Sequence, residues 1–516
     1  MKTLRSYVEG KWMAGSGPGA KLENPATEEV LAETSTTGID MHQALAFARD
    51  TGGPALRELG FAQRGELLEG MTRAIHGARE ELIELAIQNG GNTRSDAKFD
   101  IDGATATLQA YAELGKSLGD AKLLVDGEPT DIAGSRLQGW HVLSPRHGVA
   151  VHINAFNFPA WGWAEKAACA MLAGMPVVTK PATASALVAW RSAELVVEAG
   201  VLPPGAFSLV CGSAGDLLDH LSWQDVVAFT GGSETGQKIR RGERVLAAGV
   251  RVNVEADSLN AAILVPGADD ATFHAFIRDV HRDMTQKAGQ KCTAIRRVIV
   301  PEAELERVRD ALSAELDSTK IGNPALDDVR MGPVATRTQQ KDVAAGVERL
   351  LTQTKVAWGD PKSVAPIGVP AGKGYFAPLL LLEATDSLAA TAVHAHEVFG
   401  PVATLLPYDG SAEHAARIVR EGQGGLVSSV YGDDRKVLAA LVHALAPWLG
   451  RLVVVDAKIA DKSVAPGTVL PQLVHGGPGR AGGGEELGGL RGMALYQQRT
   501  AVQGNGPLIA RFIGKN

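Results

Sequence analysis

Residues 225–239 read DVVAFTGGSETGQKI, an apolar run followed by a glycine-rich turn and then by a segment with helical spacing. A glycine-rich turn between a strand and a helix exposes backbone N–H groups at the positive end of the helix dipole, where an anion can bind. Glycines that only make an ordinary strand-to-helix turn tight explain the same residues equally well. The stretch therefore predicts one strand–turn–helix unit and leaves an anion site open.

The same strand-then-helix order repeats on both sides of this unit. Strand-like runs are expected at 148–153, 176–180, 207–211, 225–230, 250–255 and 261–265. Amphipathic helices are expected between them, at 162–173, 184–199, 214–220 and 233–248. Strands that alternate with helices favour a doubly wound parallel sheet and hence an α/β fold. Because ligands of such sheets bind at the carboxyl ends of the strands, residues at those ends are the first candidates for a site.

The rest of the 516 residues predicts a second α/β unit and two less regular regions. Residues 41–119 carry apolar residues at three- and four-residue steps, which predicts helices. From 268 to about 457, strand-like and helix-like segments alternate again. Residues 135–147 and the C-terminal tail contain β-like runs without a core of their own. A chain of this length predicts more than one domain.

The composition is typical of a soluble globular protein, with 45% hydrophobic and 21% charged residues. A net charge of −7 gives the whole chain no attraction for nucleic acid or an anionic membrane. Three cysteines cannot build a disulfide framework and fit a reducing compartment. The first residues lack the apolar run of a signal peptide, and no stretch reaches the length of a membrane span. We therefore expect a cytoplasmic protein whose partners are neither nucleic acids nor membranes.

Three polar side chains stand where a site is expected, although each has an ordinary alternative. Lys180 ends a strand-like run, where a cation could hold a ribose or a phosphate, but a surface lysine is the more common case. Glu255 also ends such a run, and a lone carboxylate there is usually solvated or caps a helix. Cys292, in KAGQKCTAIRRVIVP (287–301), is by itself more often a small buried apolar residue than a nucleophile.

Two further motifs are not interpreted as sites. GPGRAG (477–482) matches GxGxxG, but it lies in a glycine tract outside any predicted βαβ unit, so a mobile loop is expected there. HAHE (394–397) places two histidines on opposite faces of a strand, and no further ligand set with zinc spacing follows. Packed or solvated histidines beside a functional glutamate are expected instead, and no metal site is predicted.

Six short motifs stand in the order typical of the aldehyde dehydrogenase superfamily, which the chain resembles over nearly its whole length. They are NAFNFP (154–159), KPA (180–182), FTGGSETG (229–236), NVEADSLN (253–260), GQKC (289–292) and HEVFGPV (396–402). The resemblance implies a sheet that binds NAD(P) without GxGxxG, and a homodimer whose small β flaps are completed across the interface. The implied domains are a doubly wound cofactor domain (1–134 and 148–256), an α/β catalytic domain (257–465) and an oligomerisation flap (135–147 and 466–516).

The resemblance also implies the catalytic residues. Cys292 matches the nucleophile, whose thiolate attacks the aldehyde carbonyl. Asn157 matches the residue that, with the backbone N–H of Cys292, holds the resulting alkoxide. After hydride transfer leaves a thioester, Glu255 matches the general base that activates the hydrolytic water.

The cofactor contacts follow from the same resemblance. Glu397 and Phe399 match residues that hold the nicotinamide ribose and ring. The other matching positions are Ile153, Lys180, Thr183, Ser185, Phe229, Thr230, Gly231, Gly232 and Gly236. Thr183 stands where the family often has a glutamate that binds the ribose diol of NAD. Since loss of this carboxylate removes repulsion of a 2′-phosphate, we expect NADP as the cofactor, with NAD weaker.

Three further differences from the family pattern are visible. The usual ELGGK reads EADSL at 255–259, the usual serine of FTGS is Gly232, and the tryptophan before the oxyanion asparagine is Phe156. The resemblance is strongest to one branch of the superfamily. It rests on the segment NVEADSLNAAIL and on the glycine tract at 475–493. Members of that branch oxidise aldehydes carried on CoA thioesters during aromatic-acid degradation, so such an aldehyde is the expected substrate.

Three alternatives stand beside this hypothesis. One is an NADP-dependent dehydrogenase of a simpler aldehyde. Another is an acylating enzyme that releases acyl-CoA, but those relatives generally lack the water-activating glutamate that is present here as Glu255. A crystallin-like protein without activity is disfavoured because Cys292, Glu255 and Asn157 are all retained.

Overall fold

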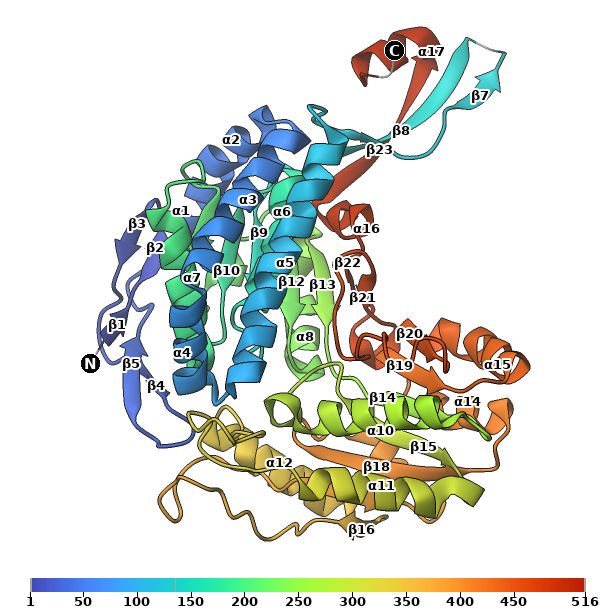
Figure 1. Cartoon of the computed structure of the whole chain (residues 1–516). Coiled ribbons are helices and arrows are strands. Elements are labelled where there is room, and N and C mark those ends of the chain that lie inside the picture. The colour runs from blue at the N-terminus through green and yellow to red at the C-terminus, as the bar shows by residue number, and fades with distance from the viewer. Residues whose placement is uncertain (1, 135, 515–516) are drawn as a thin grey trace.

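The computed structural model describes residues 2–134 and 136–514. Residues 1, 135 and 515–516, which fall inside the expected cofactor domain and flap, lie outside the described residues. Figure 1 shows two α/β units, one formed mainly by the N-terminal half and one by the chain beyond residue 260, with a β arm that projects from the first unit. The prediction of an α/β fold is thus confirmed.

The first unit contains a seven-stranded sheet in the order β13-β12-β9-β10-β11-β2-β3. The strands are β2 (Ser6–Val8), β3 (Lys11–Met13), β9 (Ala150–Ile153), β10 (Val177–Lys180), β11 (Phe207–Leu209), β12 (Val226–Thr230) and β13 (Arg251–Glu255). The five strands from β13 to β11 are parallel, and β2 and β3 add an antiparallel edge. Because β10 and β11 lie on one side of β9 and β12 and β13 on the other, the strand order reverses beside β9, which creates a ligand crevice.

Helices cover both faces of this sheet, so its doubly wound character is confirmed. Val177 packs into one core and its neighbour Val178 into another, as the alternation of side chains along a strand requires. The helices are α1 (Met41–Phe47), α2 (Gly53–Glu58), α3 (Phe61–Gly77), α4 (Arg79–Gly90), α5 (Arg94–Leu118), α6 (Trp161–Ala173), α7 (Ala186–Glu198), α8 (Ser233–Arg240) and α9 (Glu243–Ala248). Figure 1 shows α3, α5, α6 and α7 together on one face.

Two expected helices differ from the prediction. The helix expected at 233–248 is divided into α8 and α9, because Gly242 between them has an extended ψ of 131°. The helix expected at 214–220 is only a 3-10 turn at Leu217–His220, preceded by Gly215 with φ +54°. Helices α1 to α5 confirm the helical prediction for residues 41–119.

The second unit is another seven-stranded sheet, in the order β16-β17-β18-β15-β14-β19-β20. The strands are β14 (Asn260–Leu264), β15 (Ile295–Pro301), β16 (Lys355–Trp358), β17 (Leu380–Glu383), β18 (Val402–Tyr408), β19 (Gly425–Tyr431) and β20 (Leu449–Val455). Its helices are α10 (Asp270–Thr285), α11 (Leu305–Asp317), α12 (Arg337–Leu350), α13 (Thr391–Ala395), α14 (Ala412–Arg420) and α15 (Arg435–Leu445). The strand expected at 261–265 is β14, so it belongs to this sheet and not to the first.

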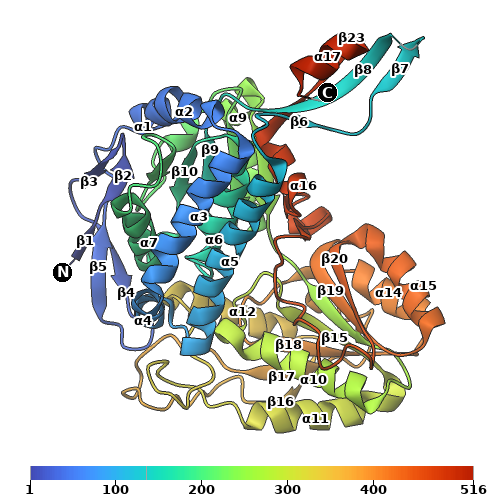
Figure 2. The same ribbon diagram turned by 45° about the horizontal axis from the view of Figure 1, so that its top comes forward.

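A four-stranded antiparallel sheet forms the projecting arm. It contains β6 (Leu124–Val125), β7 (Thr130–Ala133), β8 (Leu137–Pro145) and β23 (Gln497–Asn505), and the C-terminal α17 (Gly506–Phe512) follows it. Tail strand β23 pairs with β8 along its length, from Gln497 opposite Pro145 to Asn505 opposite Leu137. Figure 2 shows that this arm stands clear of both α/β units.

The glycine tract at 475–492 is packed rather than a free loop, which corrects the expectation for GPGRAG. It forms the hairpin of β21 (Val474–Gly476) and β22 (Glu485–Leu487), followed by α16 (Leu490–Met493). Gly482 has φ +103°, and a Cβ on it would lie 2.2 Å from the carbonyl oxygen of Val254. Only glycine fits this approach to β13.

The N-terminal residues form a further, small sheet of β1 (Lys2–Leu4), β5 (Val30–Thr34) and β4 (Ala20–Glu23). None of the helices within the described ranges combines the length and the apolar composition needed to cross a bilayer.

Candidate active site

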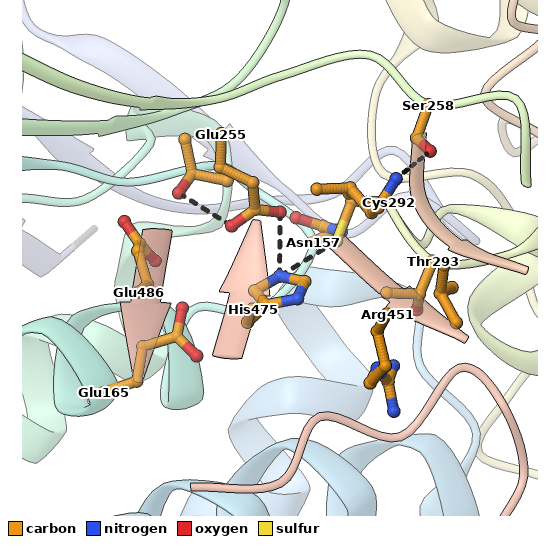
Figure 3. Close-up of polar contacts among 12 residues, drawn as sticks. Asn157, Glu165, Glu255, Ser258, Cys292, Thr293, Arg451, His475 and Glu486 are labelled. Atoms are coloured by element: carbon orange, nitrogen blue, oxygen red, sulfur yellow. Dashed lines mark hydrogen bonds and ion pairs between the residues drawn. The ribbon is translucent and has the colours of Figure 1, made fainter. Parts of the chain in front are cut away.

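Asn157, Glu255 and Cys292 meet at one cleft of about 1200 Å³, although they lie far apart in the sequence. Asn157 follows β9, Glu255 ends β13, and Cys292 precedes β15 of the second sheet. The cleft therefore lies at the carboxyl ends of the first sheet, where the strand order reverses. All three predicted catalytic residues are brought together (Figure 3).

The loop that carries Cys292 is held in an unusual conformation. Lys287 and Ala288 have φ of +54° and +52°, and Gly289 has φ +68°. A Cβ on Gly289 would lie 2.2 Å from the carbonyl oxygen of Gly400, so glycine is required there. Asn260 donates hydrogen bonds from Nδ2 to the carbonyls of Cys292 (2.8 Å) and Ala294 (2.9 Å). These contacts fix the position of the cysteine.

The amide of Asn157 is buried and oriented by this same loop. Its Nδ2 donates to the carbonyl oxygen of Gln290 at 2.9 Å. An amide nitrogen has two hydrogens, so the second remains for a group in the cleft. Asn157 can thus support a negative oxygen formed next to Cys292.

His475, on β21, contacts both Glu255 and Cys292 (Figure 3). Its Nε2 lies 3.2 Å from Oε1 of Glu255 and 4.0 Å from Sγ of Cys292. Burial favours the neutral form of Glu255, but the charge of His475 outweighs it and lowers the pKa of Glu255 to about 2. Burial likewise disfavours charge on His475, yet Glu255 raises the pKa of His475 above its ordinary value. The two form a buried ion pair.

The thiol of Cys292 is in an environment that favours its protonated form. Burial raises its pKa well above 9.0, and the negative charge of Glu255 raises it further. Cys292 is nevertheless the one of the three cysteines that is partly exposed, since Cys169 and Cys211 are buried. It is accessible but not activated without a further positive charge.

Behind Glu255 lies a buried charged cluster of Glu165, Lys166 and Glu486. Lys166 Nζ lies 3.3 Å from Glu165 Oε1 and 3.0 Å from Glu486 Oε2. Burial raises the pKa of Glu165 to about 7, although Lys166 opposes this. Two carboxylates against one ammonium leave this cluster with an excess of negative charge next to Glu255.

Glu397 and Phe399 line the same cleft from the second unit. Glu397 Oε2 accepts from the backbone N–H of Ser258 at 3.0 Å, and its Oε1 lies 3.2 Å from a guanidinium nitrogen of Arg296. Burial raises the pKa of Glu397 to about 7 in spite of Arg296. The Phe399 ring stands edge-on to Phe156 at 5.8 Å.

Two polar residues of the EADSL segment, Asp257 and Ser258, have structural roles. Asp257 accepts from both the backbone N–H (2.9 Å) and the hydroxyl (2.6 Å) of Ser233, at the first residue of α8. Ser258 donates to Asn260 at 2.6 Å and accepts from the N–H of Leu426 at 2.8 Å. The two side chains thereby tie the end of β13 to α8 and to the second sheet.

The glycine-rich turn after β12 borders the cleft. Phe229, Thr230, Gly231 and Gly232 all line it. A Cβ on Gly232 would meet nothing within 4 Å, so this turn faces open space. Gly236 has another role, because a Cβ there would lie 2.8 Å from Val254, and its absence lets α8 pack against β13.

Four predicted cofactor residues lie at neighbouring strand ends but do not line the cleft. Ile153 and Lys180 end β9 and β10 and stand opposite each other in register. The Thr183 hydroxyl donates to the carbonyl of Gly212 at 3.1 Å, and that of Ser185 donates to the carbonyl of Phe156 at 2.7 Å. Burial lowers the pKa of Lys180.

A second, narrow pocket of about 40 Å³ meets the cleft at Cys292 and Glu255. Phe99, Phe158, Trp161 and Val469 give it apolar walls, and His475 and Glu165 also line it. The reactive residues thus stand between a wide cleft and a narrow, largely apolar pocket.

Sequence reasoning missed His475, Glu165, Lys166 and Glu486. His475 and Glu486 lie in or beside the glycine tract, and Glu165 and Lys166 lie on a helix that reads as an ordinary apolar one. The sequence offered one signal of this cluster. Glu165 and Lys166 are two charged residues in an otherwise apolar helix, and charged residues are rarely buried unless they are paired.

The chain is similar to known proteins over most of its length. Residues 12–498 match the aldehyde dehydrogenase family. The chain is 45% identical over 478 residues to 3,4-dehydroadipyl-CoA semialdehyde dehydrogenase of Aromatoleum evansii, covering 92% of this chain and 93% of that protein. It is 27% identical to the NADP(+) succinate-semialdehyde dehydrogenase GabD of Escherichia coli K12, covering 90% and 91%.

Solved structures share the fold at low sequence identity. A betaine aldehyde dehydrogenase mutant of Staphylococcus aureus, in complex with NAD+, superimposes with a TM-score of 0.85 at 23% identity, covering 98% of both chains. The NAD+ complex of an aldehyde dehydrogenase from Bacillus cereus gives 0.85 at 24% identity, covering 98% of this chain and 97% of that one.

Proposed function

The chain belongs to the aldehyde dehydrogenase family, and we propose that it oxidises a CoA-linked semialdehyde to the acid through a thioester on Cys292, with NADP. The observation that carries the chemistry is the convergence of Asn157, Glu255 and Cys292 on one cleft. The substrate class rests on the 45% identity to a dehydrogenase of such a semialdehyde.

The residues around the cleft fit a dinucleotide cofactor. The turn lines the cleft at Gly231 and Gly232 and faces open space at Gly232, at the start of α8, where backbone N–H groups favour a phosphate. Glu397 supplies a carboxylate for ribose hydroxyls, and Phe399 supplies a ring face. When bound, the cofactor supplies the hydride acceptor and a positive charge that favours the Cys292 thiolate.

The first half of the reaction uses Cys292 and Asn157. The thiol of Cys292 gives its proton to solvent, and Glu255 remains ionised beside His475. The sulfur attacks the aldehyde carbon, and the carbonyl oxygen becomes an alkoxide. The amide of Asn157 and the backbone N–H of Cys292 stabilise this oxygen. Loss of hydride then leaves the acyl group on Cys292.

The second half is hydrolysis of that thioester. Glu255, which is ionised beside His475, takes a proton from a water molecule that attacks the acyl carbon. Cys292 leaves as the thiolate, and the acid is released. His475 acts as a positioning residue because its charge keeps the carboxylate ionised despite burial.

The preference for NADP is proposed from Thr183 and Lys180. Thr183 carries no charge that would repel a 2′-phosphate, and its hydroxyl donates to Gly212 in this structure. None of the described carboxylates acts on the pKa of Lys180, so its ammonium group remains available to a phosphate at the carboxyl end of β10.

The division into domains is proposed as well, with 1–134 and 148–256 for the cofactor, 257–465 for catalysis and 135–147 with 466–516 for assembly. The arm begins earlier than this division, because β6 and β7 pair with β8. A homodimer is proposed, since apolar side chains such as Ile132 and Phe512 are exposed along the arm (52% and 73%). A cytoplasmic location is also proposed, because the three cysteines fit a reducing compartment.

The proposal is tested by absorbance of the reduced nicotinamide with CoA-linked and free aldehydes, each with NAD and NADP. We expect the highest kcat/KM for a CoA-linked semialdehyde with NADP. Equal kcat/KM for free aldehydes of the same chain length would overturn the substrate class, and a preference for NAD would overturn the cofactor assignment.

A further inference from the structure

Three side chains that can each bind a metal ion converge at the base of the cleft. Cys292, Glu255 and His475 each place one ligand atom so that all three lie within 4.8 Å of one another. Thiolate, imidazole and carboxylate are the ligands that Zn²⁺ takes in proteins. The proposed reaction uses these residues as nucleophile, base and positioning group, and assigns no metal to them.

The distances between these atoms suit a single tetrahedral ion. Zinc bonds of about 2.3 Å to sulfur and about 2.0–2.1 Å to nitrogen or oxygen place ligand atoms about 3.3–3.6 Å apart. His475 Nε2 lies 3.2 Å from Glu255 Oε1 and 4.0 Å from Cys292 Sγ. The separation of His475 Nε2 from Cys292 Sγ exceeds the tetrahedral range by about 0.4 Å, and the ligand atoms of Cys292 and Glu255 lie within 4.8 Å of each other.

The carboxylate oxygen at the centre of this cluster lacks a hydrogen bond. Glu255 is 2% exposed, and its Oε1 has no hydrogen-bond partner among the described residues. It is close enough to His475 for charge attraction, but the hydrogen-bond geometry is not met. A buried oxygen without a donor is a position that a cation satisfies.

The surrounding charges also favour a cation. Ligand oxygens of Glu165, Glu255 and Glu486 lie within 4.8 Å of one another, and Lys166 and His475 together offset two of the three charges. The nearby Arg451 is held by the carbonyls of Pro466 and Thr468, at 2.7 and 2.5 Å. Both the cleft and the narrow pocket reach Cys292 and Glu255, which provides an entry path and room for a water as the fourth ligand.

We propose that Cys292, His475 and Glu255 form a binding site for one Zn²⁺-like cation, and that the occupied site is a reversibly inhibited form of the protein. On binding, the thiol of Cys292 and the imidazolium of His475 each give one proton to solvent, and the sulfur and Nε2 form bonds to the metal with no change in oxidation state. The bound sulfur cannot attack an aldehyde, and the bound carboxylate cannot act as a base. Hard ions such as Mg²⁺ do not compete, because they avoid thiolate ligands.

Cobalt(II) reports this site without any turnover, so the outcome is independent of the proposed function. The reduced full-length protein, stripped of metal, is titrated with Co²⁺ in the absence of aldehyde and cofactor. We expect a thiolate-to-cobalt charge-transfer band in the near ultraviolet that saturates at a single equivalent per chain and disappears when Zn²⁺ is added. The band should be absent in Cys292→Ser and retained in Cys211→Ser, whose cysteine is buried elsewhere.

The histidine provides the sharper comparison. His475→Phe and His475→Gln should both weaken Co²⁺ binding at least about tenfold while keeping the far-ultraviolet spectrum of a folded chain. Zn²⁺ should inhibit the wild type, with recovery on adding a chelator, and Mg²⁺ should not. A missing charge-transfer band in the wild type, a band that persists in Cys292→Ser, or unchanged affinity in both histidine variants would each overturn the proposal.

Discussion

Nε2 of His475 lies 3.2 Å from Oε1 of Glu255, and this buried contact sets the charge of the proposed general base. Burial alone would raise the pKa of Glu255, whereas His475 lowers it to about 2. The same imidazole lies 4.0 Å from the sulfur of Cys292. One residue from the glycine tract therefore connects the base and the nucleophile, which come from two different sheets.

Replacing His475 should move the acid side of the pH–rate profile. Glu255 acts as a base only when ionised, and its lowered pKa keeps it ionised above about pH 2. Without His475, burial is no longer opposed by that charge, so the pKa rises and activity is lost at higher pH as the solution is acidified. For His475→Phe we expect the acid limb of kcat to move up by at least about two pH units, to about pH 4 or above.

The control for this variant is His475→Gln, which keeps a polar side chain but not the charge. In steady-state assays between pH 4 and 9, the wild type should show no acid limb from Glu255, because the pKa of about 2 lies below this range, whereas both variants should lose activity toward pH 4. A kcat that stays as flat toward pH 4 in both variants as in the wild type would show that His475 does not set the ionisation of Glu255.

Alkylation of Cys292 in the free protein should accelerate with pH. Since burial and the charge of Glu255 raise the pKa of the thiol well above 9.0, its thiolate fraction increases about tenfold per pH unit through the neutral range. We expect iodoacetamide labelling, followed by mass spectrometry, to show no plateau below about pH 9. Saturating NADP should lower the pH at which labelling levels off. A plateau near pH 7 without cofactor would contradict this account, and Cys292→Ala identifies labelling at other sites.

Thr183→Glu should reverse the cofactor preference. A carboxylate at this position repels a 2′-phosphate and can accept from the ribose hydroxyls of NAD. We expect the ratio of kcat/KM for NADP to that for NAD to fall at least about tenfold. A tenfold change corresponds to the same free energy as a shift of one pKa unit, which is typical of repulsion between two nearby like charges. Thr183→Ser keeps the hydroxyl that donates to Gly212 and should leave the ratio unchanged. The same ratio in both variants would exclude Thr183 as the determinant.

Gly289→Ala should destabilise the loop that carries the nucleophile. Gly289 has φ +68°, and its added Cβ would overlap the carbonyl oxygen of Gly400 at 2.2 Å. We expect a loss of at least about 1 kcal/mol in the free energy of unfolding, seen as a lower Tm, together with reduced activity. Gly77→Ala is the matched control, because it lies in α3 with nothing within 4 Å of the added Cβ. Equal Tm values for the two variants would contradict the steric explanation.

The fold was predictable where strands and helices alternate with clear apolar periods. The prediction was wrong at 214–220, where Gly215 adopts a left-handed conformation, and at 233–248, where Gly242 interrupts the helix. Periodicity alone does not reveal these breaks. It also does not assign β14 to a sheet, because two consecutive buried strands read alike in sequence.

The site was predictable only where short motifs mark it. Asn157, Glu255 and Cys292 stand in such motifs, and the structure brings them together. His475 stands in a glycine tract whose packing against β13 is decided by backbone contacts, such as that of Gly482 with Val254. Contacts between chain segments more than 200 residues apart leave no local pattern.

The central claim is that Cys292 carries an acyl group that Glu255 helps to hydrolyse. Intact-protein mass spectrometry of Glu255→Gln, quenched in acid after mixing with aldehyde and NADP, tests it most directly. Because removal of a general base slows its step by about 10²–10⁴-fold, the account predicts a nearly stoichiometric acyl adduct on Cys292 and one rapid equivalent of reduced cofactor. Wild-type turnover by Glu255→Gln with no adduct, or an adduct that still forms in Cys292→Ala, would contradict it.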